Sequence, residues 1–256
     1  MEFIQIIIYV SIYLGLVATS FYVLSFIAGK KKKELLFEDN ELPKVSVLIP
    51  VYNEEGSIAR TLNSILASDY PKEKLEILVI NDGSTDKTLE IAKKFEKRGV
   101  KIYSKKNGGK ASALNFALTK CKGEIFFSMD ADTIVESYSL KSMIRYFKDK
   151  DIMCVSPAIV TYKPKNVWQR IQHIEYLLGV FLRKTFAFLN SVHITPGAFS
   201  AYRKSFVDKY GGYQENNITE DLELTLRIQF HGYRIENDAN APAYTNSPST
   251  FMHLLK

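Results

Sequence analysis

The sequence predicts an α/β protein with a mostly parallel sheet, helices on both faces of it, and one membrane-spanning helix in front. Apolar runs of five or six residues alternate with longer segments of helical spacing. The runs at 45–49, 75–80 and 125–129 are nearly continuous in apolar residues, as parallel strands buried on both faces require. The first 28 residues contain a separate, uncharged stretch.

That uncharged stretch runs from Phe3 to Ala28 and is long enough to cross a bilayer. Glu2 precedes it and Lys30–Lys33 follow it, whereas a cleaved signal peptide carries its positive charge in front. Lysines next to a membrane helix are typically on its cytoplasmic side, where they bind anionic lipid headgroups. We expect a retained transmembrane helix at 3–28, a basic and polar linker at 29–43, and one cytoplasmic domain at 44–256.

Composition narrows the possible classes of function. The 256 residues are 46% hydrophobic and 24% charged, which is ordinary for a globular domain. The net charge of +6 owes much to the four-lysine run, and no nucleic-acid-binding motif accompanies it. Cys121 and Cys154 lack the spacing of a zinc site. We therefore expect membrane lipid rather than nucleic acid as a partner.

The elements of the domain follow one another in an alternating order. Pro43 opens the first strand, and a helix starts near Ile58 with apolar residues at helical spacing. After the second strand, Ser84 or Thr85 can cap a further helix that reaches about Arg98. A strand at 100–103, a helix at 111–120 and the strand at 125–129 complete a βαβαβαβ series. Right-handed crossovers then give a parallel sheet with helices on both faces.

Two common phosphate-binding motifs are absent. The turn Asn107–Lys110 lacks the earlier glycine of a P-loop, and the first strand-to-helix turn lacks the GxGxxG pattern of dinucleotide-binding proteins. These absences argue against P-loop and nicotinamide enzymes.

Acidic residues follow the strand at 125–129 directly. Asp130 and Asp132 lie at the edge where ligands bind in open α/β sheets, and both can face one divalent cation that carries a phosphate. The alternative is an acidic turn. The neighbouring strand ends carry Tyr52, Asp82 and Lys110, which suit a base, a uracil or ribose, and a phosphate. Taken singly, these three also fit a core aromatic residue, a turn cap and a solvated helix start.

Five motifs in order resemble those of family 2 glycosyltransferases of the GT-A fold, over about Lys44 to Lys256. They are Pro50–Glu54, Asn81–Ser84, Gly109–Asn115, Asp130–Asp132 and Thr219–Asp221. The similarity is greatest to the membrane-embedded processive branch, which includes poly-N-acetylglucosamine, hyaluronan, chitin and cellulose synthases.

This resemblance implies roles for individual residues. The nucleotide-sugar would contact Tyr52, Glu54, Asp82, Lys110 and Asp130. Two aspartates, Asp130 and Asp132, would bind Mg²⁺ or Mn²⁺ with the diphosphate, and Asp221 would be the general base. On the acceptor side lie Glu220 and Gly197, the latter within the segment Thr195–Arg203.

Two helices keep alternative interpretations at this stage. Glu220–His231 reads as a helix with Thr219 as its N-cap and Gly232 after its end, so the acids of its first turn also have a purely structural explanation. The long segment Val167–Leu189 fits either an interfacial helix on the bilayer or a core helix.

The resulting hypothesis is an inverting enzyme at the cell membrane, its catalytic domain cytoplasmic, that moves a sugar from a nucleotide diphosphate, in the first instance UDP, to a saccharide acceptor. The alternatives are transfer to a polyprenyl or dolichyl phosphate or another lipid acceptor, and a non-catalytic membrane partner. Processive relatives carry a QxxRW motif and further membrane helices after the segment matching Ser247–Lys256. We therefore expect a chain truncated at its C-terminal end.

Overall fold

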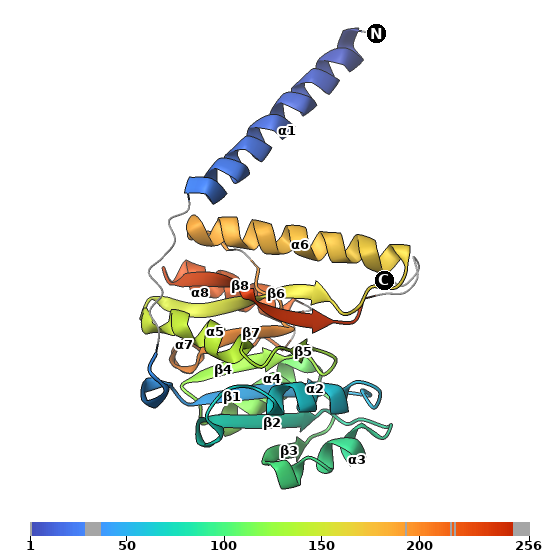
Figure 1. Cartoon of the computed structure of the whole chain (residues 1–256), viewed down its shortest axis with the longest axis vertical. Helices are drawn as coiled ribbons and strands as arrows, with labels where there is room; N and C mark the ends of the chain where they lie inside the picture. The colour runs from blue at the N-terminus through green and yellow to red at the C-terminus, as the bar shows by residue number, and fades with distance from the viewer. Residues whose placement is uncertain (1, 29–36, 193, 216, 218, 248–256) are drawn as a thin grey trace.

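The computed structural model describes residues 2–28, 37–192, 194–215, 217 and 219–247. It contains one eight-stranded sheet with the strand order β3-β2-β1-β4-β7-β6-β8-β5, and helices cover it (Figure 1). The strands are β1 Val45–Val51, β2 Leu75–Asn81, β3 Val100–Ser104, β4 Ile125–Met129, β5 Ile134–Val135, β6 Ile152–Thr161, β7 Phe199–Arg203 and β8 Arg234–Thr245. The α-helices are α1 Glu2–Ala28, α2 Ile58–Leu66, α3 Thr88–Lys93, α4 Lys110–Lys120, α5 Ser139–Ile144, α6 Val167–Phe188, α7 Lys204–Tyr210 and α8 Glu220–Phe230.

The four strands of the N-terminal half are parallel, as the sequence predicts. β1 pairs with β2 on one side and with β4 on the other, and β2 pairs with β3. Every residue of β1 and of β4 is buried. The predicted cause of the continuous apolar runs, burial on both faces of the sheet, is therefore confirmed for these strands.

The other half of the sheet mixes directions. β7 runs antiparallel to both β4 and β6, and β5 runs antiparallel to β8, whereas β6 and β8 are parallel. The β4–β7 register places Met129 opposite Phe199. Because the strands are antiparallel, the end of β4 meets the beginning of β7, and the Asp130 amide donates to the carbonyl of Ala198 (3.1 Å). The segment around Gly197 is thereby held beside the acids that follow β4.

Hydrophobic residues pack on both faces of the sheet. One cluster contains Ile58 and Leu62 of α2 together with Met143 of α5, and the other contains Leu114 of α4 and Ile228 of α8. Successive β4 residues point to opposite faces, so Phe126 stacks on Tyr202 in one cluster and Phe127 stacks on Phe199 in the other. These pairs join β4 to β7 from both sides.

One predicted helix start is wrong. α3 begins at Thr88, and neither Ser84 nor Thr85 caps it. Both are used by the loop after β1 instead, since the Ser84 hydroxyl accepts from the Asn53 amide (3.1 Å) and the Thr85 amide donates to Asn53 Oδ1 (2.8 Å). A polar contact between two loops therefore outcompetes the local cap.

The predicted linker and the chain end are only partly covered. The four-lysine run and residues 248–256, to which the expected C-terminal truncation refers, lie outside the described residues. Among the residues that are described, one helix is long and apolar enough to cross a membrane, by length and composition, over Phe3–Ile27.

Gly123, between α4 and β4, tests how tightly the backbone packs at the start of β1 and β4. A Cβ there would lie 2.5 Å from the Ser46 amide nitrogen and 2.7 Å from the Ile125 carbonyl oxygen, and both belong to backbone that cannot move freely. We expect Gly123→Ala to lower the free energy of unfolding by about 2 kcal/mol or more in thermal or denaturant unfolding. At Gly56 a Cβ meets nothing within 4 Å, so Gly56→Ala is the matched control. Equal stability of the two variants would contradict the packing described for β1 and β4.

Candidate functional site

A cavity of about 510 Å³ opens at the carboxyl edge of the parallel strands. Six residues that the sequence analysis singled out line this cavity. They come from the loops after β1, β2 and β4 and from the start of α4, and they are Tyr52, Glu54, Asp82, Lys110, Asp130 and Asp132. Its lining residues are Pro50, Val51, Tyr52, Glu54, Asp82, Asn107, Gly109, Lys110, Asp130, Ala131 and Asp132. Parallel strands all end at the same edge of the sheet, so the residues that directly follow them lie close together there.

The two aspartates after β4 lie in a turn that is fixed from both sides. The Thr61 hydroxyl donates to the carbonyl of Ala131 (2.7 Å), and the Thr245 hydroxyl donates to Asp132 Oδ2 (3.3 Å). Burial, and next the negative charge of Asp130, raise the pKa of Asp132. The two carboxylates therefore repel each other, and a cation placed between them would relieve that repulsion.

Lys110, the first residue of α4, supplies the positive charge in this part of the site. Its Nζ lies 2.6 Å from Asp130 Oδ1 and 3.7 Å from Glu220 Oε1. Burial lowers the pKa of Lys110, but Asp130, Glu220 and Asp221 together outweigh burial and raise it. Lys110 therefore does begin a helix, as the simpler interpretation has it, but its side chain is ion-paired between two carboxylate groups rather than only solvated.

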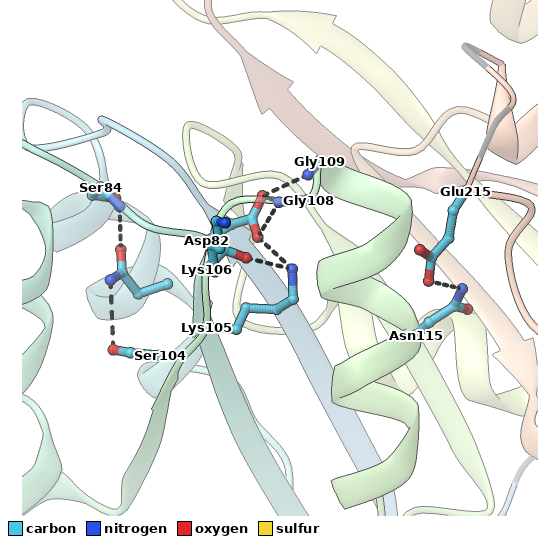
Figure 2. Close-up of polar contacts among 10 residues, drawn as sticks. Asp82, Ser84, Ser104, Lys105, Lys106, Gly108, Gly109, Asn115 and Glu215 are labelled. Atoms are coloured by element: carbon cyan, nitrogen blue, oxygen red, sulfur yellow. Dashed lines mark hydrogen bonds and ion pairs between the residues drawn. The ribbon is translucent and has the colours of Figure 1, made fainter.

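Asp82 organises the loop in front of α4. Asp82 is only 3% exposed, and its carboxylate accepts from the amides of Gly108 (3.1 Å) and Gly109 (2.8 Å) and from Lys105 Nζ (2.7 Å), as Figure 2 shows. The positive φ of Gly109 (85°) turns its amide toward this carboxylate. Asp82 thus caps a neighbouring loop. The sequence did not reveal Lys105 as its partner, because the pairing crosses between two strand ends.

Tyr52 and Glu54 form the outer side of the cavity. Tyr52 is 50% exposed, so its alternative interpretation as a core aromatic residue is wrong. The Glu54 amide donates to the Thr88 hydroxyl (2.7 Å), and the Glu54 carboxylate accepts from the Ser57 hydroxyl. Glu54 therefore fastens the loop to α3 and leaves the Tyr52 ring accessible.

Gly197 and Asp221 meet next to this cavity. The Gly197 amide donates to Asp221 Oδ2 (3.0 Å), and the Leu222 amide donates to Asp221 Oδ1 (2.9 Å). A Cβ on Gly197 would lie 2.8 Å from Lys110 Nζ and 3.3 Å from Asp221 Oδ2. A side chain here would therefore displace the tip of Lys110 and the Asp221 carboxylate, and Lys110 connects the two groups of acids.

Thr219 does not act as the side-chain cap that the sequence predicts. Within the described part of the chain, its hydroxyl donates to Asn217 Oδ1 (3.1 Å) and makes no bond to the first turn of α8. The residue that fixes α8 is instead Thr225, which donates to the Asp221 carbonyl (2.6 Å) and bonds to the Thr195 hydroxyl (2.6 Å). In the sequence, nothing singled out Thr225 for this contact, because its burial depends on how α8 packs.

A second link crosses from α4 to the segment before α8. Asn115 Nδ2 donates to the Tyr213 carbonyl (2.8 Å) and to Glu215 Oε1 (3.1 Å; Figure 2), while Asn115 Oδ1 accepts from the Tyr213 amide (2.8 Å). The sequence motif contained Asn115 without indicating this role. Together with Lys110, it makes α4 the helix that contacts both the segment before α8 and the start of α8.

Solved structures with the same arrangement define the class of fold. The mannosyltransferase PcManGT from Pyrobaculum calidifontis, in complex with GDP-Man and Mn²⁺, has a TM-score of 0.74 at 23% identity and covers 95% of this chain and 70% of its own. TarS residues 1–349 from Staphylococcus aureus, in complex with UDP-GlcNAc, has a TM-score of 0.61 at 22% identity and covers 81% of this chain and 59% of its own. The fold is GT-A-like.

The family follows from the sequence comparison. The model described as glycosyl transferase family 2 matches residues 46–211, which is more than half of the chain, so the chain belongs to this family of glycosyltransferases. A poly-beta-1,6-N-acetyl-D-glucosamine synthase from Staphylococcus aureus (strain MSSA476) is 31% identical over 97% of this chain. The probable glycosyltransferase YdaM from Bacillus subtilis (strain 168) is 32% identical over 82% of it. The matches span 61% and 52% of these two relatives.

Gly197 provides a test of how closely the two groups of acids approach. We expect Gly197→Ala to leave the thermal unfolding midpoint nearly unchanged, because the tip of Lys110 can move, but to lower sugar-transfer activity about tenfold or more, because Lys110 and Asp221 are displaced. Gly179→Ala is the control, since its Cβ would also face the tip of a basic side chain, Arg183 Nη1 at 3.2 Å. Full activity of Gly197→Ala would contradict the tight contact.

Proposed function

We propose that this protein is a membrane-anchored, inverting glycosyltransferase that moves a sugar from a UDP-sugar to a saccharide acceptor at the cytoplasmic face of the membrane. The observation that carries the proposal is the meeting of Asp130 and Asp132, in the cavity, with Asp221, through Lys110 and Gly197. Donor-side and acceptor-side carboxylates then lie within reach of one reacting sugar. The domain assignment remains 3–28 for the anchor, 29–43 for the linker and 44–256 for the catalytic domain.

The donor side is assigned from the strand ends. The accessible ring of Tyr52 would stack on the uracil, and Asp82 would recognise uracil or ribose from the cavity wall. Because Asp82 is already bonded to two amides and to Lys105, its contribution includes holding the Gly108–Gly109 loop in shape for the nucleotide. Glu54 would complete the same wall.

The carboxylates after β4 fit a hard divalent cation. In the described part of the chain, no group of three or more acidic, His or Cys side chains is placed to hold a metal alone. Two carboxylates with oxygen ligands suit Mg²⁺ or Mn²⁺ when a diphosphate completes the coordination. When bound with the nucleotide, the ion would neutralise charge on the departing diphosphate.

Lys110 would change partners during this reaction. Its Nζ neutralises Asp130 at 2.6 Å, so the chain itself supplies the positive charge that a metal would otherwise bring. With a metal bound at Asp130, Lys110 would be free to contact a phosphate while it stays near Glu220. Glu220 thereby keeps the lysine on the acceptor side of the donor.

Asp221 is assigned as the general base. The Gly197 and Leu222 amides hold one bond to each of its oxygens, and each carboxylate oxygen retains a further lone pair for an acceptor hydroxyl. Both amides orient the carboxylate without neutralising it. In a single displacement, Asp221 would remove the proton of the acceptor hydroxyl while the acceptor oxygen bonds to the anomeric carbon and the bond from that carbon to the diphosphate breaks, which inverts the anomeric configuration.

The anchor and the relatives guide the choice of substrate. Phe3–Ile27 has the length and composition to cross a membrane, and the lysines after it favour a cytoplasmic catalytic domain. One relative is a poly-beta-1,6-N-acetyl-D-glucosamine synthase, and TarS is described in complex with UDP-GlcNAc. UDP-GlcNAc is therefore the first donor to test.

The first prediction concerns the metal. With membrane-reconstituted full chain and a panel of UDP- and GDP-sugars, we expect release of nucleoside diphosphate that depends on Mg²⁺ or Mn²⁺. Asp132→Ala should abolish this release with little change in thermal stability, because Asp132 lies at a strand end rather than in the core. Full activity in excess chelator would overturn the metal assignment.

The same assay separates the alternative functions. Absence of release from every donor would favour the non-catalytic alternative, and labelled product that extracts into organic solvent would favour a lipid acceptor.

The second prediction concerns the base. Asp221→Asn keeps the size of the side chain and one of its two amide contacts, since the Asn Nδ2 cannot accept from an amide, and it removes the base. We therefore expect turnover to fall by roughly 10²- to 10⁴-fold with nearly unchanged UDP affinity. Steady-state kinetics and UDP titration measure both quantities. If stability falls in proportion to activity, Asp221 has only a structural role at the start of α8.

A further inference from the structure

A chain of buried hydroxyl groups leads to the backbone of Asp221. Tyr202 of β7 is 1% exposed, and Thr195, before β7, and Thr225 of α8 are fully buried. The hydroxyl oxygens of Tyr202 and Thr195 lie 3.0 Å apart, and those of Thr195 and Thr225 lie 2.6 Å apart. The Thr225 hydroxyl then reaches the Asp221 carbonyl oxygen at 2.6 Å. The three hydroxyls therefore connect the sheet to the residue assigned as the base.

The end of this chain fixes the direction of each of its bonds. A carbonyl oxygen only accepts, so the single hydroxyl proton of Thr225 is committed to Asp221. Thr225 then accepts from the hydroxyl and from the amide (3.2 Å) of Thr195. Thr195 in turn accepts from Tyr202. Burial raises the pKa of the Tyr202 phenol well above its ordinary value, so the phenol keeps the proton that it donates.

A chain with one arrangement of its protons holds its members in place rather than conducting a proton. Every hydroxyl proton in it has one acceptor, and the last acceptor is a backbone carbonyl. Buried networks that are satisfied in this way are rigid. The far end is anchored as well, because the Tyr202 ring stacks on Phe126 of β4 and β7 pairs with β4 along its whole length.

The segment before β7 holds Asp221 at two points. The Asp221 carbonyl is bonded through Thr225 to Thr195, and the Asp221 carboxylate accepts from the amide of Gly197, two residues further along. One bond would leave the carboxylate free to pivot. Two bonds to the same segment restrict both its position and its rotation, so the carboxylate is oriented before a substrate arrives.

The bond from Thr225 to Asp221 would be unremarkable without its continuation. Threonine hydroxyls in helices often bond to the carbonyl four residues earlier, with only a structural effect. Thr185 of α6 is also fully buried and makes such a bond to the Phe181 carbonyl (3.0 Å). Thr225 differs because its oxygen also accepts from both groups of Thr195.

We propose that Tyr202, Thr195 and Thr225 are positioning residues that hold the Asp221 carboxylate in the orientation needed to take the proton of the acceptor hydroxyl. The proposal rests on the proposed function, in which Asp221 is the base. None of these three residues lines the cavity, so their effect on the reaction passes through Asp221. Loss of the chain therefore lowers turnover and leaves donor binding unchanged.

A pair of variants at Thr225 separates the hydroxyl from the packing. Thr225→Val keeps the shape of the side chain and removes the hydroxyl, whereas Thr225→Ser keeps the hydroxyl. In the reconstituted full chain, we expect Thr225→Val to lower kcat for UDP release about tenfold or more, with the donor KM changed less than about twofold. Thr225→Ser should restore most of the turnover.

Thr185→Val is the matched control. It removes a buried bond of the same kind from α6, and it should keep the turnover of the unmodified chain. Tyr202→Phe removes the first bond of the chain and is expected to act in the same direction as Thr225→Val. It carries the test if Thr225→Val does not fold, which circular dichroism and thermal unfolding report.

Deuterium exchange of backbone amides reports the hold on Asp221 without any need for activity. The amides of Gly197 and Leu222 both donate to the Asp221 carboxylate. Mass spectrometry of peptides that contain them measures their exchange in the full chain. We expect both amides to exchange about tenfold faster or more in Thr225→Val, because the hold is loosened, and to be unchanged in Thr185→Val.

Three results would overturn the proposal. Unchanged exchange in Thr225→Val would show that the chain does not hold Asp221. Faster exchange with full turnover would show that this hold does not matter to the reaction. An equal loss of turnover in Thr225→Ser, or a similar loss in Thr185→Val, would assign the effect to packing. Absence of UDP release from the unmodified chain is a separate result, seen before any substitution, and it would refute the proposed function itself.

Discussion

The antiparallel pairing of β7 with β4 is the constraint on which the site depends. β4 ends at the acids of the cavity, and β7 begins immediately after Gly197, so the pairing of Met129 with Phe199 brings these two segments together. The stacked pairs Phe126–Tyr202 and Phe127–Phe199 hold the pairing from both faces of the sheet. A parallel strand at this place would begin at the opposite edge.

Ion pairs also hold the acids of the site in place, in addition to the pairing of β7 with β4. Asp130, Asp132, Glu220 and Asp221 form a negatively charged region that Lys110 partly neutralises. Asp132 is held by the Thr245 hydroxyl and Asp221 by two backbone amides, while Asp130 and Glu220 are held by Lys110, so the arrangement exists without a bound ligand. The positive charge of Lys110 joins Asp130 of the cavity to Glu220 at the start of α8. In the proposed function, a cation with a diphosphate would take over part of this role.

The sequence predicted the structure best where a residue pattern has a single physical explanation. Apolar runs such as Ile125–Met129 predicted parallel strands because burial on both faces leaves no other pattern, and Asp130 was placed correctly because strand ends gather at one edge. The mixed half of the sheet was not predicted, since strand direction depends on distant partners. Ser84 and Thr85 failed as caps because Asn53, thirty-one residues or more away, binds them instead. For α6, helical spacing alone could not distinguish lipid from protein as the partner of its apolar face.

The most direct test of the central claim is to locate Mn²⁺ by anomalous scattering in crystals of the full chain grown with UDP-GlcNAc. The account predicts one Mn²⁺ peak bordering the carboxylates of Asp130 and Asp132 and the diphosphate, with Lys110 moved off Asp130 and still beside Gly197. A nucleotide bound outside the cavity, or an ordered diphosphate with Lys110 still paired to Asp130 and no Mn²⁺ peak, would contradict it.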